Sequence, residues 1–115
     1  MYRTVGEVFA SYPRRFNKRK ARGLRSVLHL DLSSDDSGRW TLFVGEDGVV
    51  VREGLLAEPE ILIECRGRDW VELSNDRLTG MEMMIAGQLM IKGPLIKLVK
   101  IQNLLEPEVV RGDDG

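Results

Sequence analysis

The sequence predicts an α+β fold in which a five-stranded, mostly antiparallel sheet carries helices on one face. Two observations indicate this fold. Apolar residues recur at helical spacing near both ends of the chain, whereas they alternate with polar residues through much of 27–65. The order of the segments is helix, four strands, helices, strand, helix, which is typical of α+β domains. We expect the 115 residues to form a single domain, 1–115.

The first helix is expected to begin at Thr4. Thr4 and Glu7 have the spacing of a capping box, in which each satisfies a backbone N–H of the other. Apolar residues then follow at helical spacing, namely Val5, Val8, Phe9 and Tyr12. Pro13 either ends this helix or opens a second short one.

Four strands are expected next, over 27–32, 40–44, 49–51 and 61–65. Turn-forming residues at 33–38 and 46–48 separate the first three, which predicts an antiparallel meander. The alternation places one set of side chains toward water on the polar face of the sheet: His29, Asp31, Thr41, Arg52 and Glu64.

Helical patterns return after residue 65. Asp69 and Glu72 have capping-box spacing, and Gly80 is a plausible helix end. We expect one or two helical turns over 81–86, a strand over 89–92 and a last helix from Pro94 to Leu105. The remaining residues, 109–115, are expected to form a frayed acidic tail.

Composition excludes several classes of protein. The apolar runs are too short for a transmembrane helix, and the first residues show no secretory signal, so we expect a cytoplasmic protein. Cys65 is the single cysteine, so no internal disulfide can form and a zinc site would lack its usual thiolates.

No residue pattern predicts an enzyme. His29 is the single histidine and lies on the predicted polar face, where a surface role is expected. Cys65 is expected to be a buried, inert thiol. The glycines form no phosphate-binding loop, and paired carboxylates occur only in turns and the tail. We therefore expect no catalytic residue, metal or cofactor.

A basic segment contrasts with an acidic remainder. Residues 1–25 contain eight basic residues and one acidic residue, although the net charge of the whole chain is −1. This segment suits an anionic membrane, an acidic partner or nucleic acid, or it is simply a solvated face. Only Tyr12 and Phe16 are available to stack on bases, which disfavours nucleic acid. The residues expected to dock on a membrane or a partner are Arg14, Arg15, Lys18, Arg19, Lys20 and Arg22.

The C-terminal third is unusually apolar. Four of the five methionines lie between Met81 and Met90, and the last helix has an apolar stripe wider than a surface helix needs. Methionine fills gaps in ordinary cores, but its flexible side chain also suits a wall that repacks around apolar guests.

The order of these motifs resembles the sterol carrier protein type 2 domain over about 5–105. The similarity rests on Phe9, 13–17, 21–23, Trp40, Gly54, 70–73, 78–80 and 87–93. Ile85 departs from the family, where many relatives have Phe. The C-terminal Asp113-Asp114-Gly115 is unlike a peroxisomal signal.

The resemblance implies that the helices enclose an apolar tunnel against the sheet. It also implies a non-catalytic domain that binds and transfers fatty acyl chains, acyl-CoA, sterols or isoprenoid lipids. The expected partners are such a lipid and, transiently, an anionic membrane or a lipid-modifying enzyme. An alternative role is an accessory subunit that presents a quinone-type precursor. The expected tunnel walls are Trp40, Leu42, Trp70, Leu73, Met81, Met84, Ile85, Ile91, Leu95, Leu98, Ile101 and Leu105.

Overall fold

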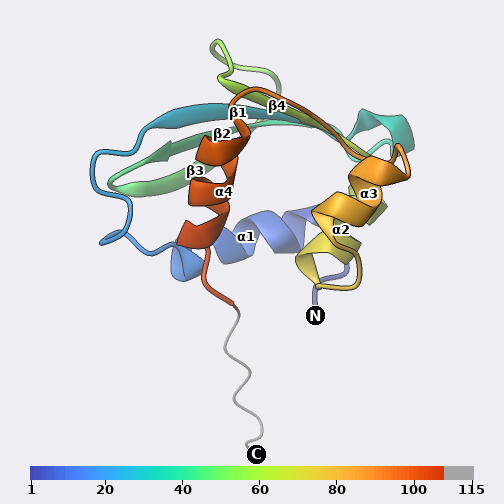
Figure 1. The fold of residues 1–115 in the computed structure, drawn as a ribbon, viewed down its shortest axis with the longest axis horizontal. Coiled ribbons are helices and arrows are strands. Elements are labelled where there is room, and N and C mark those ends of the chain that lie inside the picture. Colours follow the sequence, from blue (N-terminus) through green and yellow to red (C-terminus); the bar gives the residue numbers. More distant parts are fainter. Residues whose placement is uncertain (108–115) are drawn as a thin grey trace, which may run out of the picture.

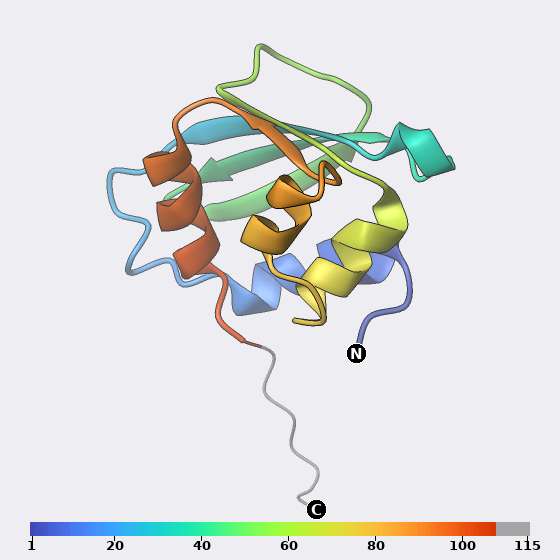
Figure 2. The ribbon, with the colours of Figure 1, turned by 45° about the vertical axis from the view of Figure 1, so that its right-hand side comes forward.

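The computed structural model describes residues 1–107, in which one face of a five-stranded sheet is covered by helices (Figures 1 and 2). The tail predicted over 109–115 lies outside the described residues. In chain order the elements are α1 (Val5–Arg15), β1 (Ser26–Asp31), the 3-10 turn η1 (Ser33–Asp35), β2 (Arg39–Gly45), β3 (Gly48–Glu53), β4 (Ile61–Glu64), α2 (Gly67–Ser74), α3 (Gly80–Ile85), β5 (Met90–Lys92) and α4 (Leu95–Leu104).

The strands lie in the order β3-β2-β1-β4-β5. Neighbouring strands are antiparallel except for β1 and β4, which are parallel, so the predicted mostly antiparallel sheet is confirmed. The parallel pair arises because the chain leaves the edge strand β3, crosses the sheet through residues 54–60 and returns beside β1 (Figure 2). This crossing covers the sheet face opposite the helices.

The crossing segment corrects the prediction that His29 and Thr41 face water. Both side chains are buried. Thr41 Oγ1 donates to the Gly54 carbonyl oxygen at 2.7 Å and accepts from the Leu56 N–H at 2.8 Å. His29 Nε2 lies 3.1 Å and 3.0 Å from the Leu56 and Ala57 carbonyl oxygens. The alternation placed these residues on the outer face correctly, but it carries no information about a segment that folds over that face.

The other three residues of that face are more accessible. Arg52 is exposed, whereas Asp31 and Glu64 are half-buried. Asp31 forms an ion pair with Arg39 on the neighbouring strand, with 3.2 Å between Oδ2 and Nε. A hydrogen bond from the Ser33 hydroxyl, with help from Arg39, holds the pKa of Asp31 below its ordinary value.

α1 begins at Thr4 as predicted, since its hydroxyl accepts the Glu7 N–H at 3.1 Å. The Glu7 carboxylate accepts the N–H of Arg3 instead of that of Thr4. Neither prediction for Pro13 is correct, because α1 continues through it to Arg15. The proline lies in the last turn of the helix, which loses one hydrogen bond because proline has no backbone N–H. The helical hydrogen bonds resume with the Phe16 N–H, which donates to the Tyr12 carbonyl oxygen.

The start of α2 also differs from the prediction. The helix begins at Gly67, and Asp69 forms an ion pair with Arg66 at 2.9 Å rather than a capping box with Glu72. The capping group is distant in sequence: Asp35 of η1 accepts the backbone N–H of Gly67 at 2.9 Å. Only glycine allows this approach, because a Cβ there would overlap the Ser37 side chain.

α3 has the capping box that the sequence analysis placed elsewhere. The Thr79 hydroxyl accepts the Glu82 N–H, and the Glu82 carboxylate accepts the Thr79 N–H, each at 3.1 Å. Gly80 is therefore the first residue of α3 rather than the end of the preceding helix. The short helix predicted over 81–86 is confirmed.

Candidate functional site

The helix-facing side of the sheet has two apolar rows, as the strand register shows. Residues paired directly across strands point to the same face. One row runs across four strands through Val51, Leu42, Leu28 and Ile61. The other runs through Trp40, Leu30, Ile63 and Ile91. The sheet therefore offers a continuous apolar floor from β3 to β5.

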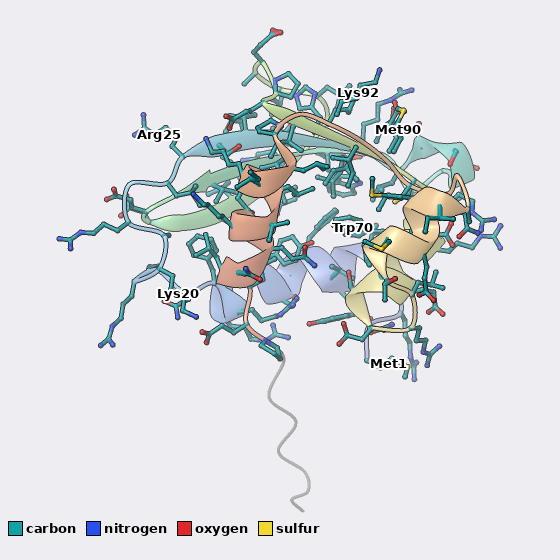
Figure 3. All side chains as sticks on the ribbon, in the orientation of Figure 1. Met1, Lys20, Arg25, Trp70, Met90 and Lys92 are labelled. Carbon is teal, nitrogen blue, oxygen red and sulfur yellow. The ribbon has the colours of Figure 1, made fainter. Side chains whose placement is uncertain are left out.

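Aromatic residues of two helices face this floor. The Phe9 ring of α1 lies 5.7 Å from the Tyr12 ring and 5.0 Å from the Trp40 ring, measured between centroids. Trp70 of α2 packs against the same core and lies in the space between α1 and the sheet (Figure 3). Phe9 and Tyr12 are absent from the predicted walls, although their helical spacing beside Val5 and Val8 was a sufficient signal.

The predicted wall residues divide into two groups. One group is buried in the core or packs against it: Trp40, Leu42, Trp70, Leu73, Ile91, Leu98, Ile101 and Leu105. The other group is exposed on α3 and α4: Met81, Met84, Ile85 and Leu95. Met81 and Ile85 are the most exposed of these, at 73% and 82%. The structure therefore brings the first group together beneath the sheet and leaves the second on the surface.

Met83 is the methionine of α3 that enters the core. It is fully buried, whereas its neighbours Met81 and Met84 are exposed. A six-residue helix with an apolar residue at almost every position gives no clear periodicity, so the sequence analysis did not select Met83. The capping box at Thr79 fixes the start of α3 and with it the face that turns inward.

The two tryptophans differ in how their indole N–H groups are satisfied. Trp40 Nε1 donates to the Ser37 carbonyl oxygen at 2.8 Å. Trp70 Nε1 is buried and has no hydrogen-bond partner of ordinary geometry among the described residues. Its neighbour is the Tyr12 hydroxyl. Burial raises the pKa of Tyr12 well above its ordinary value, although the nearby Trp70 indole opposes this shift.

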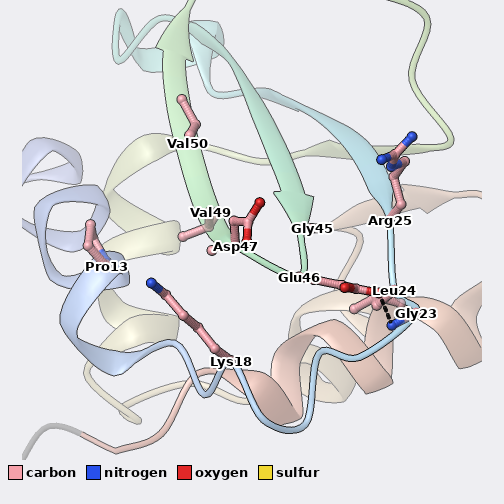
Figure 4. Close-up of a pocket in the computed structure, with 11 residues that line it drawn as sticks. Pro13, Lys18, Gly23, Leu24, Arg25, Gly45, Glu46, Asp47, Val49 and Val50 are labelled. Carbon is pink, nitrogen blue, oxygen red and sulfur yellow. Dashed lines mark hydrogen bonds between the residues drawn. The ribbon is translucent and has the colours of Figure 1, made fainter.

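Two surface cavities lie outside this apolar region. One, of about 550 Å³, lies between the end of α1, residues 18–25 and the β2–β3 turn (Figure 4). Lys18, Arg25, Glu46 and Asp47 make its lining strongly polar, and Glu46 accepts the Gly23 N–H at 2.6 Å. None of the predicted wall residues lines it.

The second cavity, of about 660 Å³, lies between η1 and the start of α2. Its lining includes Asp31, Glu64, Arg66 and the buried Cys65. Burial, with the negative charges of Asp69 and Asp35, raises the pKa of the Cys65 thiol to about 12. Within residues 1–107 no cluster of His, Cys, Asp and Glu side chains is arranged to hold a metal ion. This cavity also lacks the predicted wall residues, so neither cavity is the expected tunnel.

The profile of the SCP-2 sterol transfer family matches residues 9–106. The chain belongs to this family. The match covers the α1 aromatics, the whole sheet and α4, which are the elements that form and enclose the apolar floor of this SCP-2 domain. No match was found among curated protein sequences.

Solved structures with this fold come from different proteins. The sec-alkylsulfatase Pisa1 from Pseudomonas sp. matches 85% of the chain with a TM-score of 0.75 and 17% identity, but the chain spans only 16% of that enzyme. Palmitated SCP2L2 from Aedes aegypti matches 93% of the chain and 100% of its own length, with a TM-score of 0.66 and 17% identity. The ubiquinone synthesis protein UbiJ-SCP2 matches 76% of the chain and 69% of its own length, with a TM-score of 0.56 and 17% identity. These likenesses show the fold.

The basic segment of the SCP-2 domain lies at one end of the molecule. Lys18, Arg19, Lys20 and Arg22 are exposed in the connection between α1 and β1, as is Arg14 at the end of α1 (Figure 3). Arg15 is half-buried and is held by the Ser11 hydroxyl at 3.0 Å and the Glu106 carbonyl oxygen at 2.8 Å. Its role is therefore structural as well as electrostatic.

The aromatic residues of that segment are buried. Tyr12 and Phe16 are 3% and 8% exposed, so neither ring can stack on a base. Base stacking by these two residues therefore gives no support for nucleic-acid binding. Along residues 1–107, no helix is long and apolar enough to cross a membrane.

Proposed function

We propose that this SCP-2 domain binds apolar lipids between the sheet and the helices and carries them between membranes or enzymes. The observation that carries this proposal is the apolar floor of the sheet, faced by Trp70, Leu98 and Ile101. Each methylene removed from water contributes about 0.8 kcal/mol, so an acyl chain needs few polar contacts to be held. Such a site discriminates weakly by chain length, which suits a carrier.

α4 provides the route of entry in this proposal. Its inner residues Leu98 and Ile101 pack on the core, whereas Leu95, Ile96 and Val99 are exposed on its outer side. A helix with apolar residues on both sides can contact the core through its inner side and a lipid surface through its outer side. We therefore propose that α4 swings away from the sheet to admit the lipid.

The test is titration of delipidated protein with a fluorescent fatty acid. Wild type is expected to bind saturably at micromolar concentration. Leu98→Trp replaces an aliphatic side chain on the inner side of α4 with a bulky indole ring. Because this ring occupies the space proposed for the lipid, we expect binding to weaken at least tenfold. The matched control, Ile96→Trp, places the same ring on the outer side and should bind as wild type does. Absence of saturable binding, or equal loss in both variants, would refute the proposal.

We also propose that the basic segment docks the carrier on an anionic membrane. The exposed side chains of Lys18, Arg19, Lys20 and Arg22 support this, because each cation near such a surface contributes about 1 kcal/mol. Removing Lys20 and Arg22 together as Lys20→Gln and Arg22→Gln should weaken binding to phosphatidylserine vesicles at least tenfold. Arg52→Gln with Arg68→Gln is the matched control, since both residues are exposed elsewhere. Equal effects of the two pairs would contradict docking through this segment.

A second candidate function is presentation of a quinone-type lipid precursor to a biosynthetic enzyme. Its support is the shared fold of UbiJ-SCP2, which is a ubiquinone synthesis protein. Affinity isolation from the native host distinguishes the two functions. A lipid-modifying enzyme recovered in equal amount favours presentation, whereas lipid transfer between vesicles by the protein alone favours free carriage. Native mass spectrometry of the freshly isolated protein would identify the lipid in either case.

A further inference from the structure

The buried indole N–H of Trp70 forms no hydrogen bond of ordinary geometry, although the Tyr12 hydroxyl lies near enough for the indole to oppose the rise in the pKa of Tyr12. Buried N–H groups are nearly always paired, because the loss of water is otherwise uncompensated. Trp40 follows this rule through the Ser37 carbonyl, but Trp70 does not. Phenylalanine at position 70 would fill most of the same space without the unpaired donor, so packing alone does not explain an indole there.

The surroundings of this donor restrict what can accept its hydrogen. Trp70 packs against the apolar core, and one polar neighbour of its indole is the buried Tyr12 hydroxyl. The nearby Arg15 guanidinium is already engaged with Ser11 and the Glu106 carbonyl oxygen. A carboxylate in this place would lack a free counter-charge, whereas a neutral oxygen would not need one.

We propose that the Trp70 N–H donates a hydrogen bond to a neutral oxygen of the bound lipid, such as that of a ketone, ester or alcohol. The inference rests on the proposed lipid binding and adds a specificity-determining residue to it. The lipid then lies with its oxygen toward α2 and its hydrocarbon along the apolar rows of the sheet. Trp70 selects oxygenated lipids over plain hydrocarbons of the same length.

The test compares 2-hexadecanone with hexadecane, both delivered from cyclodextrin, as competitors of the fluorescent fatty acid. Wild type is expected to prefer the ketone by about fivefold, the size of one net hydrogen bond. Trp70→Phe should bind both competitors equally. Trp40→Phe is the matched control: it removes an indole that is already paired, so the preference for the ketone should remain even if both affinities change.

A second measurement uses the unmodified protein and therefore does not depend on the variant folding. The ¹⁵N–¹H spectrum contains two indole resonances, one for each tryptophan. The Trp70 resonance should move downfield with 2-hexadecanone and not with hexadecane, while the Trp40 resonance should respond equally to both.

The outcomes separate this inference from the proposed function. A Trp70→Phe variant that still prefers the ketone, or an indole resonance that responds equally to both competitors, overturns the role of Trp70 while leaving lipid binding intact. If neither competitor displaces the probe because the probe itself does not bind, the proposed function fails and this inference fails with it.

Discussion

Lys97 Nζ lies 2.8 Å from Glu60 Oε1, and this ion pair joins the first turn of α4 to the residue that precedes β4. A hydrogen bond also holds the C-terminal end of α4, where the Leu104 carbonyl oxygen accepts the Asn17 N–H at 2.7 Å. The first turns of α4 are therefore held to the sheet by one side-chain ion pair and by the packing of Leu98. If α4 opens to admit lipid, this end is the one expected to move.

Removing the ion pair should speed lipid exchange. Lys97→Met keeps the length of the side chain and removes its charge. Because the pair is partly exposed and such pairs contribute about 0–1 kcal/mol, we expect probe dissociation to accelerate by up to about fivefold with little change in Tm. Stopped-flow release of the fluorescent fatty acid measures this. Lys100→Met is the control, since Lys100 is also exposed on α4. An unchanged release rate in Lys97→Met would argue against opening at this end.

The Asp35 carboxylate should stabilise the protein through α2. It accepts the backbone N–H groups of Gly67 and Arg68, and loss of a helix cap typically costs about 1 kcal/mol. Asp35→Asn keeps one acceptor oxygen but puts an amide NH₂ in place of the other, so one of these two N–H groups loses its acceptor, and we expect the free energy of unfolding to fall by about 1 kcal/mol in urea titrations. Asp36→Asn is the control: Asp36 is exposed and has a φ of 65°, a conformation that asparagine adopts readily. Equal stability of wild type and Asp35→Asn would show that the second carboxylate oxygen contributes nothing to stability.

The contribution of Asp35 should depend on pH. Burial alone would raise the pKa of Asp35, but hydrogen bonds from the Arg68 and Gly67 N–H groups outweigh it and lower the pKa below the ordinary 3.8. The folded protein therefore binds this proton less readily than the unfolded chain does. The resulting stability is complete above about pH 4 and is lost as the pH falls through the folded-state pKa.

Urea titrations of wild type and Asp35→Asn across this range provide the check. The difference in unfolding free energy should be largest near pH 6 and shrink toward pH 2. A difference that stays constant down to pH 2 would mean that the charge of Asp35 is irrelevant to the cap. Asp31 also has a lowered pKa, chiefly through the Ser33 hydroxyl, so wild type itself should lose stability in the same direction.

Local periodicity was enough to predict most elements but not the contacts between distant segments. The alternation around Leu28 and Leu30 predicted a strand and its inner face. The Asp35 cap on Gly67 and the cover of Thr41 by residues 54–60 join positions far apart in sequence, which no local pattern encodes. In the candidate site the same limit applies. Apolar character identified Trp70 and Leu98, but it could not show that Met81 and Ile85 point outward while Met83 points inward.

The buried Thr41 hydroxyl should be important for stability. It bridges the Gly54 carbonyl oxygen and the Leu56 N–H, so Thr41→Val would leave both backbone groups unpaired. We expect a loss of about 1–3 kcal/mol in unfolding free energy, with faster hydrogen exchange at the Leu56 amide. Thr41→Ser keeps the hydroxyl and is the control, with a smaller loss from the missing methyl group. If valine were tolerated as well as serine, the crossing segment would be held by packing alone.

Cys65 should react slowly with alkylating agents. Its thiol is buried, and a pKa of about 12 leaves only a trace of the reactive thiolate at pH 8. Iodoacetamide at pH 8 is expected to label native protein at least a hundredfold more slowly than protein unfolded in urea. Mass spectrometry over time measures both rates. Rapid labelling of the native protein would show that the second cavity opens to the reagent.

The placement of the methionines in α3 has a consequence for oxidative damage. Peroxide converts accessible methionine to its sulfoxide, which is polar and poorly accommodated in a core. Met81 and Met84 are exposed to attack, whereas Met83, two residues after Met81 and next to Met84, is fully buried. Mild oxidation therefore modifies Met81 and Met84 on the outer surface of α3 first and spares Met83, which anchors the helix in the core. The protein is thus expected to keep its packed interior while its surface methionines are oxidised.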